Sequence, residues 1–142
     1  MKVRTWATFA SDLPDDHIEN EAGDEILQFG GKSVVAAVGE ILTRLGGAVS
    51  PPIYAHEHGW QLNAKFGKRR LWCQVTLIEG WVMVFEDRTF MGSLLGYHRL
   101  YLEVLTQLAR ELGRDPRFHD VAWFRSDEVL TGVVGAEEPV SE

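Results

Sequence analysis

The chain has 142 residues, which is enough for one domain with its own hydrophobic core. Its formal net charge is −7, from 21 acidic and 14 basic side chains, and this balance argues against a nucleic-acid-binding domain. A single cysteine excludes an intrachain disulfide, and the sequence contains neither a secretory signal nor an apolar run long enough to span a membrane, so we expect a cytoplasmic protein.

The N-terminal part combines one predicted strand with an acidic segment. Residues 2–9 alternate between apolar and polar side chains, which predicts a strand. The segment of about 11–28 is polar and rich in turn-forming residues, so we expect a loop or a short surface helix there. Seven acidic side chains fall in this segment: Asp12, Asp15, Asp16, Glu19, Glu21, Asp24 and Glu25.

A helix is predicted over residues 33–45. Its apolar side chains recur at helical spacing and share one face: Val34, Val38, Ile41, Leu42 and Leu45. Ser33 is the residue expected to cap its N-terminus, and the Gly46-Gly47 pair is expected to end it.

The most regular part of the sequence predicts a three-stranded antiparallel meander. Residues 60–66 place apolar side chains at alternate positions, which is typical of a strand with one buried face. Residues 71–78 continue this alternation. Residues 81–85 are apolar throughout, which indicates a strand covered on both faces.

The C-terminal part predicts a second helix and one more strand. From about residue 93 to 112 the apolar period changes to that of a helix, and Gly113 and Pro116 are expected to end it. Residues 121–124 are typical of a strand, and we expect the tail of about 134–142 to be disordered. The order of elements predicts a single α+β domain over residues 1–142, in which a mainly antiparallel sheet of four to five strands packs against two helices.

The sequence YAHEHGW contains the clearest candidate for a metal site. If this stretch is a strand, His56 and His58 point to the same side, as two ligands of one metal do. Zinc requires three or four ligands, and the other histidines (His17, His98 and His119) offer no second spaced pair. We therefore favour an exposed segment that leads into the strand at residue 60, with a metal site as the alternative.

The sequence FGGKS, residues 29–33, contains the GKS of a phosphate-binding loop. The full motif requires a glycine five residues before Gly31, where this chain has Ile26. We interpret the segment as the start of a helix, whose N-terminus can still attract an anion.

Two single residues have both a structural and a functional interpretation. His98 falls at the centre of the apolar arc of the second predicted helix, so we favour a core position over a ligand or a general base. Cys73 falls on the apolar face of a central strand, which indicates an inert buried thiol.

Two groups of side chains are candidates for binding a partner. The acidic segment is either a solvated surface or a recognition surface for a basic partner, to which we assign Asp12, Asp15, Asp16, Glu19, Glu21 and Asp24. The face of the sheet opposite the helices displays Trp72 and Ile78, which we expect to anchor an interface unless the terminal segments cover them.

Taken whole, the chain resembles the small cytoplasmic immunity proteins that bacteria make against polymorphic or contact-delivered toxins. The likeness covers roughly residues 33–125. It is carried by size, acidity and a helix followed by a meander opened by Gly-Trp (HGWQLNAKF, RRLWCQVTLIE and GWVMVFED) and a long helix. The resemblance implies a protein without catalytic activity or cofactor that binds one toxin tightly.

The resulting hypothesis is a non-enzymatic protein, monomeric or homodimeric, whose partner is a basic toxin domain rather than nucleic acid or a membrane. Type III secretion chaperones are similar in size and acidity, and a chaperone for a secreted effector is one alternative. A small metal-dependent enzyme that uses His56 and His58 is the other.

Overall fold

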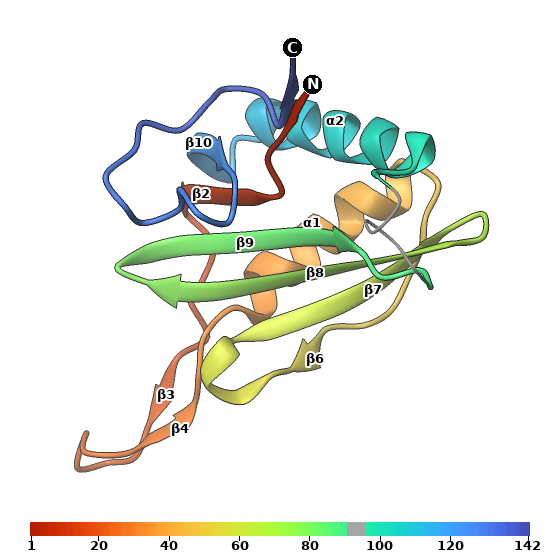
Figure 1. Cartoon of the computed structure of the whole chain (residues 1–142). Helices are drawn as coiled ribbons and strands as arrows, with labels where there is room; N and C mark the ends of the chain where they lie inside the picture. Colours follow the sequence, from red (N-terminus) through yellow and green to blue (C-terminus); the bar gives the residue numbers. More distant parts are fainter. Residues whose placement is uncertain (91–95) are drawn as a thin grey trace.

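The computed structural model describes residues 1–90 and 96–142 and shows an α+β domain (Figure 1). In chain order its elements are β1 (Lys2–Val3), β2 (Trp6–Ser11), β3 (Ile18–Glu19), β4 (Ile26–Gln28), α1 (Lys32–Arg44), β5 (Ala48–Val49), β6 (Ile53–Tyr54), the 3-10 turn η1 (His56–His58), β7 (Trp60–Phe66), β8 (Arg69–Ile78), β9 (Gly80–Asp87), α2 (Arg99–Arg114), β10 (Phe118–Phe124) and β11 (Val140–Ser141).

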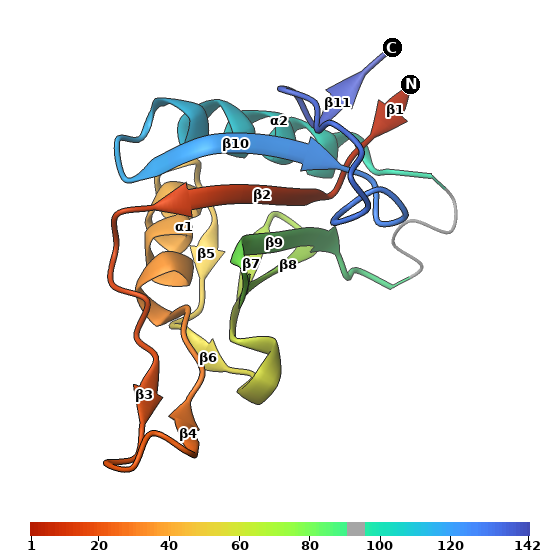
Figure 2. The same ribbon diagram turned by 90° about the vertical axis from the view of Figure 1, so that its left-hand side faces the viewer.

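The main sheet is antiparallel and has the strand order β10-β2-β9-β8-β7-β5, with β6 also paired to β7. The predicted meander is confirmed as β7, β8 and β9. In the described part of the chain the sheet has seven strands rather than four to five, because the two-residue strands β5 and β6 extend one edge. Both helices lie on the same side of this sheet (Figure 2). We refer to the opposite side as the outer face.

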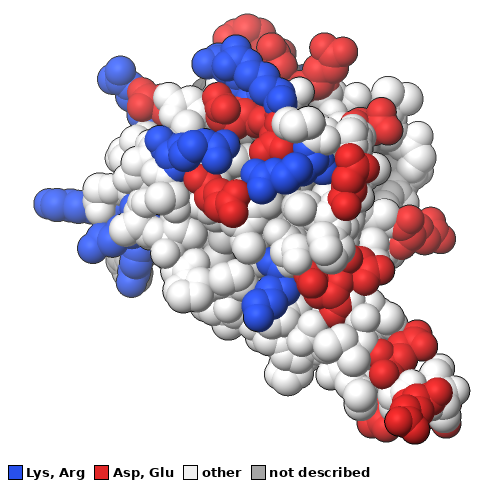
Figure 3. All heavy atoms as spheres, turned by 180° about the vertical axis from the view of Figure 1, so that it is seen from behind, with Lys and Arg blue, Asp and Glu red and all other residues white. Residues whose placement is uncertain are grey.

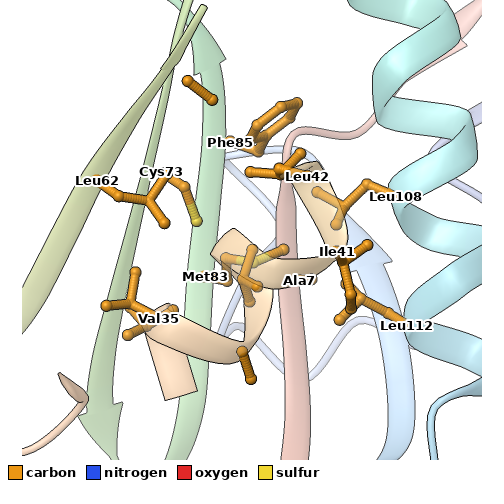
Figure 4. Packing of buried hydrophobic residues seen from close by; sticks show 14 of the residues in the cluster. Ala7, Val35, Ile41, Leu42, Leu62, Cys73, Met83, Phe85, Leu108 and Leu112 are labelled. Carbon is orange, nitrogen blue, oxygen red and sulfur yellow. The ribbon is translucent and has the colours of Figure 1, made fainter. Parts of the chain in front are cut away.

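The hydrophobic core fills the space between the helices and the sheet (Figure 4). Its fully buried side chains include Leu62, Cys73, Met83 and Phe85 from strands and Ile41, Leu42, Leu108 and Leu112 from helices. Burying one such leucine or isoleucine stabilises the fold by about 2 kcal/mol. Tyr101 of α2 adds a polar contact, because its hydroxyl donates a hydrogen bond to the carbonyl oxygen of Phe85.

The start of α2 corrects the prediction for His98. The helix begins at Arg99, and the predicted residues 93–95 lie outside the described residues. His98 is the N-cap: it is exposed, and its Nδ1 accepts a hydrogen bond from the backbone N–H of Leu100 at 3.1 Å. Gly96 adopts a left-handed backbone conformation, with φ 91°, which does not continue a helix. The apolar period therefore extends further toward the N-terminus than the helix does.

The C-terminal tail, expected to be disordered, is paired with the N-terminal segment. Residues of β11 pair with β1, and the backbone of Ala136 bonds to that of Trp123 in both directions. Arg4 adds hydrogen bonds to the carbonyl oxygen of Glu138 at 3.3 Å and to the hydroxyl of Ser141 at 2.9 Å. These long-range contacts satisfy the backbone groups that would be free in a frayed tail.

Arg117 connects the end of α2 to α1. Its guanidinium donates to both carboxylate oxygens of Asp115, at 3.0 Å and 2.8 Å, and to Glu40 at 2.9 Å. The hydrogen bonds from Arg117 lower the pKa of Asp115 below its ordinary value of 3.8, although partial burial opposes this effect.

This pKa shift predicts an acid-dependent loss of stability. A carboxylate with a lowered pKa in the folded state stabilises the fold above pH 3.8, and this contribution is lost as the pH falls toward the lower folded pKa. We expect Asp115→Asn to flatten the fall of the unfolding free energy below about pH 4, measured by urea denaturation across pH. The same slope in wild type and variant would contradict the assignment.

Neither helix of the described residues is long and apolar enough to cross a membrane.

Candidate functional site

The acidic segment forms a hairpin that projects from the body of the domain (Figures 1 and 2). We name residues 15–30 the arm. Its strands β3 and β4 have two and three residues, and none of its side chains belongs to the hydrophobic core. Three of its apolar side chains are instead exposed to solvent: Ile18 at 48%, Ile26 at 44% and Leu27 at 57%. Of the two predicted alternatives, the surface helix is wrong, because the segment is a loop that contains the short strand pair β3 and β4. The arm presents apolar and acidic side chains together.

The tip of the arm is closed by Asn20. Its side-chain amide donates to Asp24 at 2.7 Å, and its side-chain oxygen accepts from the backbone N–H of Asp24 at 3.1 Å. The backbone N–H of Gly23 bonds to the carbonyl oxygen of Asn20 at 3.0 Å. Such asparagine-centred turns fix a short loop without a core of its own.

The base of the arm is held by hydrogen bonds to distant parts of the chain. The backbone N–H of Phe29 donates to the hydroxyl of Tyr54, and the indole of Trp60 donates to the carbonyl oxygen of Phe29, both at 2.9 Å. Gly30 lies so close to the opposite side of the arm that a Cβ there would be 2.2 Å from the carbonyl oxygen of Asp15. The base is thus tightly packed, and it fixes the direction in which the arm projects.

Asp16 joins the arm to the N-terminus of α1. Its carboxylate accepts a hydrogen bond from the backbone N–H of Ser33 at 2.6 Å and another from the Ser33 hydroxyl at 3.1 Å. The N-cap residue itself is Gly31, which has no side chain, so the predicted cap by Ser33 is replaced by a cap from the arm. The anion held at the FGGKS segment is therefore a carboxylate of the chain itself.

This contact predicts that Asp16 matters for folding. Asp16→Ala removes the cap and places alanine at a φ of 65°, so we expect the free energy of unfolding to fall by about 2 kcal/mol in chemical denaturation. Asp16→Asn, which keeps an acceptor oxygen and tolerates this φ, should lose less. Glu21→Ala is the matched control, because no described hydrogen bond or ion pair involves its side chain. Equal stability of the Asp16→Ala and Glu21→Ala variants would refute the cap.

The six predicted acidic site residues do not form one cluster. Asp12 lies before the arm and contacts His119 of β10 at 2.8 Å, while Asp15 and Asp16 belong to the base. The acids of the outer part of the arm are Glu19, Glu21, Asp24 and Glu25, and Figure 3 shows acidic side chains gathered at its tip. The structure therefore separates the acids of the base, which make structural hydrogen bonds, from the acids of the tip.

The two predicted apolar anchors lie at opposite ends of β8. Trp72 is only 8% exposed, because the guanidinium of Arg88 stacks over its ring at 3.5 Å. Ile78 is 47% exposed and lies beside the turn from β8 to β9. Arg88 therefore covers the Trp72 ring, and Ile78 is the more exposed of the two predicted anchors.

Ile78 and its neighbour Leu77 separate two hollows in the surface. One, of about 220 Å³, lies between the arm and the sheet and is lined by His17, Ile26 and Leu77, among others. The other, of about 430 Å³, is lined by Ile78, Leu130 and Val133 together with residues of β2 and β9. The surface beside the arm therefore offers two recesses for apolar side chains of a partner.

The second hollow contains strained backbone that the sequence did not reveal. Glu79, Asp120 and Leu130 line it, and all three have a positive φ of 53° to 60°. Non-glycine residues in this conformation cost about 1 kcal/mol or more and occur often at functional sites.

The HEH stretch forms the turn η1 between β6 and β7 rather than part of a strand. His56 has a φ of 56° and packs against the ring of Tyr54 at 4.9 Å. His58 is exposed and its Nε2 lies 3.6 Å from the Glu57 carboxylate. Within residues 1–90 and 96–142 no group of three or more histidine, cysteine, aspartate or glutamate side chains is arranged to hold a metal ion.

Cys73, predicted as an inert thiol, is fully buried, and its burial raises its pKa.

Comparison of the chain with protein-family models, with curated proteins and with solved structures gave no match. The site is therefore described by its geometry alone: a firmly based projecting arm with acidic and apolar side chains, next to two apolar recesses.

Proposed function

We propose that this protein is a non-enzymatic binding protein of the immunity type, which neutralises a toxin by docking the arm onto a basic surface of the toxin domain. The observation that carries the proposal is the arm itself. It adds nothing to the core, yet its base is fixed by hydrogen bonds to Ser33, Tyr54 and Trp60. A rigid projection loses little conformational entropy when it binds, which favours affinity.

The chemistry of the arm favours a partner that is basic and partly apolar. The acidic tip attracts a positive surface at long range and accelerates association. The exposed side chains of Ile26 and Leu27, with Ile78 nearby, supply the apolar contacts that slow dissociation. This division of roles is typical of interfaces in which charge sets the rate of encounter and buried apolar groups set the lifetime.

The test begins with the reading frames beside the gene, among which we expect one that encodes a toxin-like protein. Expressed alone in bacterial cells, its toxic domain should arrest growth, and co-expression of the wild-type protein should restore it. The charge-reversed Glu21→Lys/Glu25→Lys variant should fail to restore growth, because it repels a basic surface.

The matched control is Glu137→Lys/Glu138→Lys, which changes the net charge equally at two exposed residues outside the arm and should restore growth. Continued arrest in the presence of the wild-type protein would sink the proposal. If the arm variant restores growth as well as the wild-type protein does, the arm is not part of the interface with the toxin.

A further inference from the structure

The far end of the main sheet carries a surface of opposite charge to the arm. Lys65 of β7 pairs in register with Arg70 of β8. Arg88, just after β9, donates its backbone N–H to the carbonyl oxygen of Arg70 at 2.7 Å. We name Lys65, Arg70 and Arg88 the cationic row. Like charges placed side by side across neighbouring strands destabilise a sheet, so this arrangement costs stability.

The row is only partly neutralised within the molecule. Arg88 approaches Glu86 at 3.3 Å and stacks on Trp72. No ion pair among the described residues involves Lys65 or Arg70, and both side chains belong to exposed residues. The neighbouring Arg69, in contrast, is paired with the carboxylate of Asp87 at 2.5 Å. Two of the three charges of the row are therefore directed to solvent and can meet an anionic partner.

The arm and the row lie at opposite ends of the domain. In Figure 1 the arm points to the lower left and the turn between β7 and β8 to the right. Figure 3 shows the same separation from behind, with acidic side chains at the tip of the arm and basic side chains at the opposite edge. The arm cannot reach the row of its own molecule, and two arms repel each other because both are acidic.

We propose that the arm of one copy docks on the cationic row of a second copy. The tip acids Glu21 and Glu25 face Lys65 and Arg70, whereas the exposed apolar side chains of the arm contribute buried area. Such a head-to-tail contact leaves one arm and one row free in each pair, so it closes into a ring or extends with concentration. This contact does not depend on the proposed function, although a basic partner that binds the arm would compete with it.

The experiment measures self-association by sedimentation velocity, with the purified chain as its own ligand. Wild-type protein should form larger species as its concentration rises at low salt. These species should dissociate at about 0.5 M salt, where charges are screened within a few ångströms. Circular dichroism confirms that each variant is folded.

Two charge-reversed variants test the contact from both sides. Lys65→Glu/Arg70→Glu and Glu21→Lys/Glu25→Lys should each weaken self-association by about tenfold or more. An equimolar mixture should restore it, because the acidic arm of the first variant then meets the basic row of the second. The Glu137→Lys/Glu138→Lys control, with the same charge change as the arm variant, should associate like wild type.

Three results would overturn the proposal. If the wild-type protein stays monomeric at every concentration, the arm does not dock on a second copy, and the partner of the row is a different acidic protein. Association that neither variant changes would place the contact on another surface. A mixture of two folded variants that stays monomeric would show that the arm and the row do not meet.

Discussion

Gly59→Ala is expected to lower the free energy of unfolding by about 3 kcal/mol, more than any other single-methyl change near the arm. Gly59 has a φ of 87°, and a Cβ there would lie 2.2 Å from the carbonyl oxygen of Val75 and 3.3 Å from that of Gly30. The contacted atoms belong to the backbone of β8 and of the arm base, which cannot rotate away as a flexible side chain would. Both the start of β7 and the base of the arm must therefore shift.

The free energy of unfolding is measured by denaturant unfolding, and two control variants separate backbone strain from steric contact as causes of its loss. Gly46→Ala introduces the same kind of backbone strain, at a φ of 105°, but into open space, so it should cost only about 1 kcal/mol. Gly80→Ala introduces neither strain nor contact and should change stability by less than about 0.5 kcal/mol. If Gly59→Ala is no more damaging than Gly46→Ala, the close packing around Gly59 is not important for stability.

If the arm binds the toxin domain proposed above, neutralising the tip of the arm should slow association by about tenfold at low salt. The variant is Glu21→Gln/Glu25→Gln, because neither of these two side chains takes part in a described hydrogen bond or ion pair, whereas Asp15 and Asp16 support the base. Folding stability should stay within about 0.5 kcal/mol of wild type. The salt dependence of the association rate should also become flatter, because fewer charges take part.

The measurement is the association and dissociation rate of the complex at low and at high salt, with Glu137→Gln/Glu138→Gln as the control of equal charge change. Ile78→Ala should instead accelerate dissociation and leave association nearly unchanged, because apolar contacts form after encounter. If the association rate of the tip variant equals that of wild type at both salt concentrations, the acidic tip is only a solvated surface and takes no part in recognition.

The regular elements were predictable from the sequence because their patterns are local. The alternation from Trp60 to Phe66 and the helical spacing from Val34 to Leu42 each report one buried face, and the structure buries those faces. The α+β fold with its central meander followed from these patterns and from their order along the chain.

The candidate site was less predictable because its contacts are distant in sequence. The strands of the arm are too short for a periodic pattern, and its base depends on Asp16 meeting Ser33 and on Phe29 meeting Tyr54 and Trp60. Likewise, alternation placed Trp72 on the outer face, but no local pattern indicates that Arg88 covers it. The acidic composition of the segment identified it as a candidate site in the sequence. Its division into a base and a tip became visible only in the structure.

The buried Cys73 is a natural probe for transient opening of the hydrophobic core. It is the one cysteine of the sequence, it has no exposed surface, and it lies in the layer between α1 and the sheet (Figure 4). A thiol reagent can reach it only after that layer separates, so the rate of labelling in native buffer measures how often the core opens. No residue has to be replaced to introduce the label. Variants of the arm can therefore be compared by mass spectrometry under conditions in which almost every molecule is folded.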